Sequence, residues 1–384
     1  MATKARLNPP FRADHVGSLK RPPELQAARE RLLGAHDASH NLGPHDNAEL
    51  RALEDRCIAD VVKLQESVGM RSITDGEFRR RNWWSDFIVA LENVDGTYAG
   101  STGMTFTNPT GQKIAMPTIM VTGKIRWPGS VHGYGCRHLA SVVKTGTPKI
   151  TMPAPQTIYY YAGRDNIDRR TYPDLRAFWD DVVAAYKAEV MALAEAGCRY
   201  IQFDEVVTAC LCDERHRELC RARGDDPDEL LRTYIDAMNR IVADRPKDMA
   251  VTHHICRGNL EGSWLAEGGF DPVAETLFNE SDADAFFLEY DTPRAGTFEP
   301  LRFLPEGKMA VLGLVSTKTP VLEPKDQLKR RLDDAARYAP LDRLGITPQC
   351  GFSSTYRGNP VTVEDEKKKL ALLVEVADEV WGGA

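Results

Sequence analysis

The sequence predicts an α/β fold, a TIM-type (β/α)8 barrel, on two observations. Beyond about residue 147, short apolar runs with strand character alternate regularly with helical stretches, as in parallel sheets whose strands are joined by helices. Eight strands are expected along the 384 residues, the number that closes such a barrel. They end near Ser18, Glu77, Pro155, Asp204, Cys256, Glu289, Lys318 and Cys350. Sites in these barrels lie at the C-terminal strand ends, so we expect these residues to share one rim.

The N-terminal segment is expected to supply the first two strands and two helices. Residues 11–18 form a short strand ending in a Gly-Ser turn, and Pro22-Pro23 begins a helix because proline suits the first helical turn. Apolar residues recur at helical spacing from about 46 to 68, which predicts the next helix. The second strand, 71–74, runs into Asp75-Gly76-Glu77.

The pattern becomes irregular between about residues 79 and 147. This range contains Trp83-Trp84, several glycines and one strand-like run at 118–122. We interpret it as an insertion after the second strand, folded over one face of the core as a hairpin and a lid-like loop. On this interpretation the chain, 1–384, is a single barrel domain.

The rest of the chain is expected to supply six strands and four helices. The strands are predicted at 149–152, 200–203, 249–256, 285–288, 309–313 and 345–347. The helices are predicted at about 174–196, 228–243, 325–336 and 364–380.

The composition is that of an ordinary soluble globular protein, with 42% hydrophobic and 27% charged residues. A net charge of −7 argues against a nucleic-acid partner, because phosphate binding needs a basic surface. No run of about 18 apolar residues is present to span a membrane, and residues 1–10 lack the apolar segment of a signal peptide. We therefore expect a cytoplasmic protein without a membrane partner, either a monomer or a homo-oligomer.

Three of the expected strand ends carry groups that bind metal ions. His254 and Cys256 lie two residues apart on a strand, so their side chains project to the same side. Glu289 and Cys350 follow two further strands, and the eight cysteines are expected to be reduced thiols. Zinc accepts N, S and O ligands together, usually four, so this set predicts a zinc site. The alternatives are a salt-bridged surface acid for Glu289 and a buried apolar residue for Cys350.

A second group of metal-binding residue types competes with the first. It consists of Cys210, Cys212, His216 and Cys220, of which the last three would stack on one helical face. Residues eight positions apart on a helix are separated by about 12 Å, so they reach one ion only with distortion. We therefore interpret this group as one face of a helix.

The other histidines and the aromatic runs have ordinary explanations. His15, His132 and His138 have no partner that the sequence reveals and are interpreted as hydrogen-bonded structural or surface residues. Trp83-Trp84 and Tyr159–Tyr161 have the flat rings that stack on a planar ligand, but such runs more often pack in a core or a lid.

Through His254-x-Cys256, Glu289 and Cys350, the chain resembles the catalytic half of cobalamin-independent methionine synthase. That enzyme is a zinc methyltransferase of the uroporphyrinogen-decarboxylase-like barrel superfamily. It is most similar to the short, single-barrel, methionine-synthase-like group, and the resemblance covers almost the whole chain. The shared motifs are His15-Val-Gly-Ser18, Asp75-Gly-Glu77, Ile201-Gln-Phe-Asp-Glu205, His254-Ile-Cys256, Glu289 and Pro348-Gln-Cys-Gly351. The N-terminal barrel of the full-length enzyme has no counterpart in these 384 residues.

The resemblance implies a role for each motif residue. It implies the zinc ligands His254, Cys256, Glu289 and Cys350. The backbone of Gly17-Ser18 would hold the carboxylate of homocysteine, and the acids Glu77 and Asp204 would hold its ammonium group.

Two residues depart from the family pattern. Tyr161 stands where the family has a tryptophan that stacks on the pterin of methyltetrahydrofolate. Lys318 stands where the family has a histidine credited with proton transfer. Three interpretations of Lys318 are open: an acid or base whose pKa is lowered near zinc, a fixed charge for an anionic donor, and an exposed rim lysine.

The expected activity is therefore that of a zinc-dependent S-methyltransferase. A thiol bound to zinc is deprotonated, whereas a free thiol with a pKa of about 8.5 is mostly protonated at neutral pH. The acceptor is expected to be homocysteine, and the donor methyltetrahydrofolate or another methyl compound. Four protein ligands fill a tetrahedral site, so the incoming sulfur would displace one, such as Glu289, or expand the shell.

Two other functions compete with methyl transfer. Epoxyalkane:coenzyme M transferases look similar over the same motifs and open an epoxide instead. Coenzyme M carries a sulfonate and no ammonium group, so Glu77 and Asp204 should repel it. The other alternative is a binding or scaffolding protein with structural zinc, but structural sites are usually closed and rich in cysteine.

Overall fold

The computed structural model describes residues 8–34, 43–97, 105–107, 113–115 and 118–384. At its centre is a parallel sheet of six strands in the order β12-β11-β10-β9-β8-β7. These strands are β7 Ile150–Pro153, β8 Tyr200–Glu205, β9 Ala250–Ile255, β10 Ala285–Glu289, β11 Met309–Val315 and β12 Leu344–Pro348. All six correspond to strands predicted from the sequence.

Two N-terminal segments close this sheet into a ring of eight positions. β1 (Ser72–Ile73) pairs in parallel with β6 (Thr147–Pro148), which leads directly into β7. At the other edge, Ala13 forms a parallel bridge to Ile346 of β12. The backbone N–H of Leu19 donates to the carbonyl of Gly76 at 3.0 Å, which joins the ends of the two segments. The predicted α/β barrel is confirmed.

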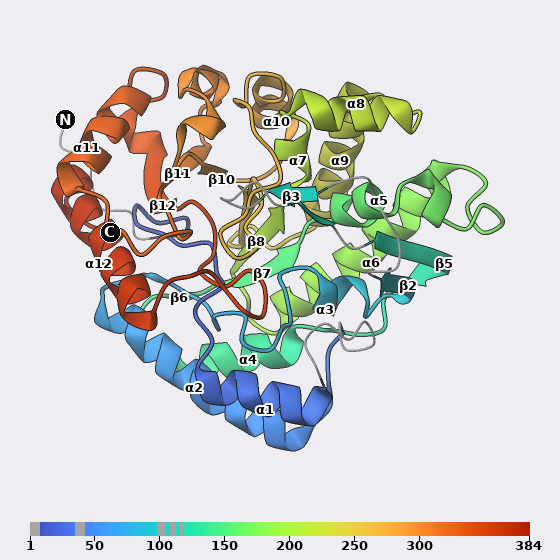
Figure 1. Cartoon of the computed structure of the whole chain (residues 1–384), viewed down its shortest axis with the longest axis horizontal. Helices are drawn as coiled ribbons and strands as arrows, with labels where there is room; N and C mark the ends of the chain where they lie inside the picture. Colours follow the sequence, from blue (N-terminus) through green and yellow to red (C-terminus); the bar gives the residue numbers. More distant parts are fainter. Residues whose placement is uncertain (1–7, 35–42, 98–104, 108–112, 116–117) are drawn as a thin grey trace.

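Helices surround the strands (Figure 1). The longer ones are α1 Pro23–Leu33, α2 Ala48–Ser67, α4 Gly133–Val142, α6 Leu175–Glu195, α8 Glu214–Ala222, α9 Pro227–Val242, α11 Lys325–Ala335 and α12 Val363–Trp381. The shorter ones are α3 Ser85–Ile88, α5 Gln156–Ala162, α7 Val207–Cys210 and α10 Ala274–Glu280. Polar side chains begin several helices: Asn47 accepts a hydrogen bond from the Leu50 N–H, and Thr362 forms a capping box with Asp365.

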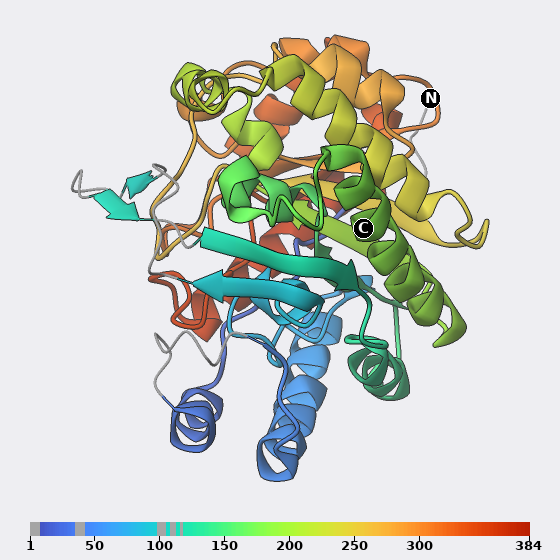
Figure 2. The ribbon, with the colours of Figure 1, turned by 90° about the vertical axis from the view of Figure 1, so that its right-hand side faces the viewer.

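The range 79–147 contains two antiparallel hairpins. β2 (Glu92–Thr97) pairs with β5 (Thr118–Arg126), and this hairpin lies beside α5 and α6 (Figure 2). β3 (Thr105–Thr107) pairs with β4 (Lys113–Ala115) in a small hairpin that projects from the body of the molecule (Figure 2). The expected hairpin is therefore present, together with α3 and α4, which the irregular sequence did not predict. The limits of the insertion and the single-domain organisation remain predictions.

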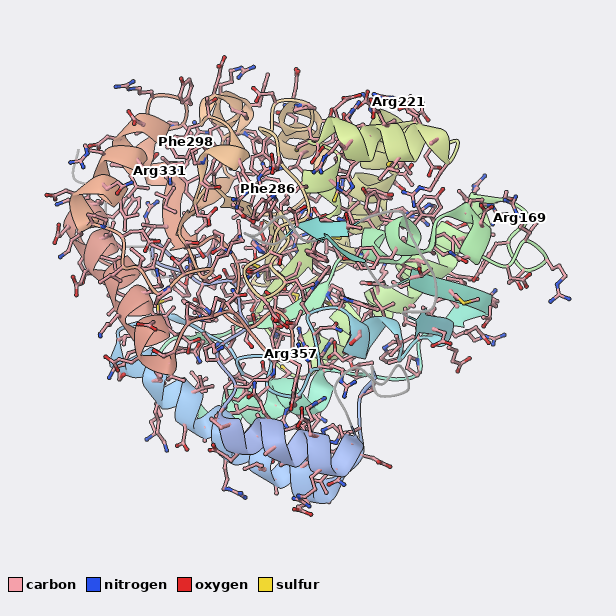
Figure 3. All side chains as sticks on the ribbon, viewed as in Figure 1. Arg169, Arg221, Phe286, Phe298, Arg331 and Arg357 are labelled. Atoms are coloured by element: carbon pink, nitrogen blue, oxygen red, sulfur yellow. The ribbon has the colours of Figure 1, made fainter. Side chains whose placement is uncertain are left out.

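The interior contains both apolar and ionic side chains. Phe286 lies in the interior, whereas charged residues such as Arg169 and Arg221 lie at the periphery (Figure 3). Inside the barrel, Lys149 donates to the Asp14 carboxylate at 3.1 Å and to the His15 carbonyl at 2.7 Å, and it is completely buried. No helix in the described part of the chain is long and apolar enough to cross a membrane.

Candidate metal centre

Three of the four predicted metal ligands form a compact group. His254 belongs to β9, and Cys256 is the first residue after this strand. Cys350 lies just beyond β12. Their ligand atoms all lie within 4.8 Å of one another, and the Sγ atoms of Cys256 and Cys350 are 3.2 Å apart. All three side chains are buried.

The hydrogen bonds around this group leave its donor atoms suited to a metal ion. The Nδ1 atom of His254 lies 3.2 Å from the Phe287 carbonyl, whereas its buried Nε2 atom has no hydrogen-bond partner. A backbone carbonyl at Nδ1 fixes the tautomer that leaves a lone pair on Nε2, as is usual for metal-binding histidines. The hydrogen bond from Cys256 and the adjacent His254 hold the pKa of Cys350 well below its usual range. Two sulfurs and one imidazole nitrogen suit zinc.

Glu289 lies at the end of β10 but is not one of these three residues. Its Oε1 atom accepts a hydrogen bond from Lys318 at 2.9 Å, and its Oε2 atom accepts one from the Arg257 N–H at 2.7 Å. Glu289 is completely buried, so the interpretation as a surface acid is wrong. Its role as fourth ligand remains a prediction, which these hydrogen bonds allow because each carboxylate oxygen has a second lone pair.

Lys318 is an ion-pair partner of Glu289. It is only 9% exposed, so the interpretation as an exposed rim lysine is wrong. Burial opposes its charge, but the Glu289 and Asp291 carboxylates outweigh burial and raise the pKa of Lys318. These carboxylates favour the charged form of Lys318, and the shift toward a neutral amine, which was expected near bound zinc, remains a prediction.

A cavity of about 240 Å³ adjoins the three donors, and most of the predicted substrate residues line it. The substrate residues that do are Ser18, Glu77, Tyr161 and Asp204, and the donors His254, Cys256 and Cys350 line it too. Gly17 lies behind this lining with φ at +138°, and a Cβ atom there would approach within 2.6 Å of Thr151 Cγ2. Only glycine fits this position without a shift.

Glu77 and Asp204, the two acids predicted to bind substrate, differ in their partners. Glu77 has a positive φ of 60°, which is rare for a residue with a side chain. Its Oε1 atom accepts a hydrogen bond from Thr151 at 2.8 Å, Arg80 lies 3.7 Å away, and its buried Oε2 atom has no hydrogen-bond partner. Asp204 accepts a hydrogen bond from Gln202 at 2.7 Å, and burial raises the pKa of Asp204 to about 8.

Several cavity residues were not identified from the sequence. Asn82, Phe106, Asn259, Leu260, Ser354 and Thr355 also line it. Asn259 donates to the Gly351 carbonyl at 2.8 Å, which ties the loop after β9 to the loop that carries Cys350. Trp83 and Trp84 line the cavity as well, and Trp84 belongs to the hydrophobic core, so the core packing expected for this pair is confirmed and stacking on a ligand stays a prediction. Among these residues, only Asn259 could have been assigned to the cavity from the sequence, because it lies three residues after the His-x-Cys motif.

The competing group is not a metal site within the described residues. His216 uses both ring nitrogens, one with the Tyr160 hydroxyl at 3.0 Å and one with the Leu265 carbonyl at 3.1 Å. α8 begins at Glu214, so the predicted helical face is confirmed for the buried His216 and Cys220 but is wrong for Cys212, which lies before the helix. Cys212 instead donates to the Thr208 carbonyl at 3.4 Å.

The three other histidines considered from the sequence, and two of the three tyrosines at 159–161, are structural, as expected. The ring nitrogens of His15, His132 and His138 face Ser72, Asp86 and Asp55 respectively. Tyr159 and Tyr160 are buried within α5 and bond to Asp225 and His216, so of the three tyrosines only Tyr161 faces the cavity.

Comparison with known proteins gives a consistent result. Residues 26–379 match the model of the family described as cobalamin-independent synthase, catalytic domain. YxjG of Bacillus subtilis is 40% identical to this chain, over 98% of this chain and 96% of YxjG. YxjH of the same organism is 37% identical, over 99% of this chain and 97% of YxjH. A probable 5-methyltetrahydropteroyltriglutamate–homocysteine methyltransferase of Schizosaccharomyces pombe is 25% identical over 97% of this chain, which spans 43% of that protein.

Solved structures agree with the fold. A putative vitamin-B12 independent methionine synthase from Listeria monocytogenes superposes with a TM-score of 0.75 at 30% identity, covering 98% of this chain and 100% of that one. A B12-independent methionine synthase from Shewanella, solved in complex with selenomethionine, superposes with a TM-score of 0.71 at 20% identity. The superposition covers 96% of this chain and 97% of that one.

Proposed function

This chain belongs to the cobalamin-independent synthase catalytic-domain family, and we propose that it methylates the thiol of homocysteine in a zinc-dependent reaction. The observation that carries the proposal is the group of His254, Cys256 and Cys350 at the wall of a cavity that is also lined by the predicted acids Glu77 and Asp204. A cavity open to the donor atoms favours catalysis over a structural zinc site, which would be closed on all sides.

The metal would be held by His254, Cys256 and Cys350, with Glu289 as the fourth candidate. Bound zinc would supply one thing, a deprotonated acceptor sulfur at neutral pH. The chain's own residues would do the rest, by fixing the acceptor and excluding water. Lys318 would hold Glu289 in place through their 2.9 Å ion pair.

The acceptor would be recognised by its ammonium and carboxylate groups. A carboxylate only accepts hydrogen bonds, so Glu77 and Asp204 suit the three donors of an ammonium group. Burial raises the pKa of both acids, so an incoming cation would stabilise their charged forms. The backbone at Gly17-Ser18 would bind the carboxylate. Two acids in the lining disfavour coenzyme M, whose sulfonate they would repel.

Methylation assays with two acceptors test the proposal. Zinc-loaded protein that is given 5-methyltetrahydrofolate or another methyl donor should transfer the methyl group to the homocysteine sulfur, with the product methionine identified by mass spectrometry. The substitution Asp204→Asn should raise the KM for homocysteine at least tenfold, since a charge-assisted hydrogen bond is lost. The same substitution should change the KM for 2-mercaptoethanol, which lacks an ammonium group, by less than threefold. Equal losses for both thiols would contradict an amino-acid acceptor.

A further inference from the structure

The cavity beside the metal centre has an aromatic wall built from separate parts of the chain. Trp84 directly precedes α3, Tyr161 belongs to α5, and Phe106 lies on β3. Trp83 completes the wall, and all four rings line the cavity. The rings of Trp84 and Tyr161 meet at 75° with centroids 5.9 Å apart. Rings in this edge-to-face contact leave no space between them, so a ligand would lie against the wall that the four aromatic residues form together.

The hairpin that carries Phe106 is fastened to the loop after β9. The Thr107 N–H donates to the Trp264 carbonyl at 2.7 Å, and the Trp264 N–H donates back at 2.9 Å. Phe106 packs so closely on Gly258 that a Cβ atom there would lie 3.0 Å from its ring. Phe106 is therefore held against the same loop that begins with the donor Cys256.

The charged groups of this cavity are acidic. Among the described residues that line it, Glu77, Asp204 and Glu205 carry acidic side chains and none is lysine or arginine. Arg80 lies 3.7 Å from Glu77 and His253 lies 3.2 Å from Glu205, whereas Asp204 forms no ion pair with any described residue. The ammonium and carboxylate groups of an amino-acid acceptor cancel each other's charge, so their binding leaves the lining acidic.

We infer that the methyl donor is an onium ion, a methyl sulfonium or a quaternary ammonium compound, held against the aromatic wall. This inference rests on the proposed function. Aromatic faces attract cations, and a desolvated quaternary ammonium is the ligand that aromatic cages recognise best. A folate donor with a glutamate tail is an anion, for which the described lining offers no basic partner. The cavity volume of about 240 Å³ also lies below the roughly 300–1,000 Å³ that holds drug-sized ligands.

The chemistry of an onium donor suits the residues present. The acceptor sulfur, whose proton is lost to solvent, forms a bond to the methyl carbon as the bond from that carbon to the donor's sulfur or nitrogen breaks. The electron pair of the broken bond stays on the leaving group, which departs as a neutral thioether or tertiary amine. No acid is needed to protonate it, which agrees with a Lys318 ammonium already engaged by Glu289. The neutral product loses its attraction to the rings and leaves.

Two measurements test the inference. Zinc-loaded protein is given homocysteine and trimethylsulfonium with deuterated methyl groups, and the expected products are deuteromethyl methionine and dimethyl sulfide. In parallel, calorimetry compares choline with 3,3-dimethylbutan-1-ol, its neutral isostere of nearly the same shape. Choline should bind at least tenfold more tightly, and Tyr161→Leu or Trp84→Leu should weaken choline about tenfold. Tyr161→Phe keeps the ring and should weaken it less than threefold.

The outcomes separate the inference from the proposed function. Equal affinity for choline and its isostere would overturn the inference, as would methionine formed from 5-methyltetrahydrofolate but not from trimethylsulfonium. If choline binds through Tyr161 but no donor methylates homocysteine, the proposed function falls while the cationic site stands. Labelled methionine that disappears in Tyr161→Leu and returns in Tyr161→Phe would support both.

Discussion

At the scale of single residues, the environment of each side chain separates the metal donors from their neighbours. His254 and Cys256 were predictable, because alternation along a strand places residues two apart on the same side. Their buried state and their approach to Cys350 within 4.8 Å agree with that geometry. The ion pair between Glu289 and Lys318 was not predictable, since it depends on side chains that meet across β10 and β11.

Zinc content should distinguish the two cysteine groups. Cys350→Ser and Cys256→Ser each remove a soft thiolate donor, so we expect purified protein to lose most of its zinc. Cys220→Ser, which alters an equally buried cysteine of the competing group, should retain one zinc per chain. Metal analysis by mass spectrometry checks this. Equal zinc in all three variants would contradict the assignment.

Substitutions at Lys318 should reveal whether its charge positions Glu289. Lys318→Met leaves a completely buried carboxylate without its cation, so we expect methylation to fall at least tenfold and the zinc affinity to change with it. Lys318→Arg keeps a charged donor and should retain most of the rate, with less than a fivefold loss. Rates like those of the unsubstituted protein in both variants would remove Lys318 from the site. An altered rate with unchanged zinc affinity would point to direct contact with substrate instead.

At the scale of elements, α4 shows why some helices were missed. Its first turn contains Gly133 and Gly135, which disfavour a helix, so the sequence gives no helical signal there. The helix forms because Glu189 of α6 caps it from outside: the N–H groups of Val131 and His132 donate to this carboxylate at 3.0 and 2.8 Å. α10 was missed for another reason, because its seven residues are too few to show a period.

The ionic contacts of His132 should make stability depend on pH. Burial opposes its charge, but Asp86 and Glu189 outweigh burial and raise the pKa of His132 to about 9. A raised pKa stabilises the folded protein fully below the ordinary value near 6.5, and this stabilisation is lost as pH rises through about 9. Urea unfolding should therefore show a loss of roughly 3 kcal/mol, as an upper bound, between pH 6.5 and 9.5.

Two histidine variants isolate this effect. His132→Gln should flatten the pH dependence, whereas His138→Gln, on the same helix, should leave it in place. A profile that stays steep in His132→Gln would assign the pH dependence to other groups.

At the scale of the whole molecule, the number and order of the barrel strands followed from the sequence, but the closure of the ring did not. Eight strand ends can be counted from apolar runs and turn residues, whereas β1 is only two residues long and the Ala13 segment makes a single bridge. The gap between them is held by polar groups: the His15 ring lies 3.1 Å from the Ser72 carbonyl, and Thr74 donates to the Gly17 carbonyl at 2.7 Å. Such contacts join residues far apart in the chain, and no local pattern records them.

The ion pair inside the barrel should therefore contribute to the stability of the whole fold. Lys149 of the β6–β7 segment donates to Asp14 of the first segment, and Tyr200 of β8 donates to the same carboxylate at 2.7 Å. Lys149→Met strands a buried charge and should lower the free energy of unfolding by about 3–5 kcal/mol. The double substitution Asp14→Asn with Lys149→Met removes both charges, so it should cost less than the sum of the single changes. Urea unfolding of the four proteins measures this coupling. Additive losses would mean that the pair stabilises through packing alone, and that ring closure depends on the backbone bridges instead.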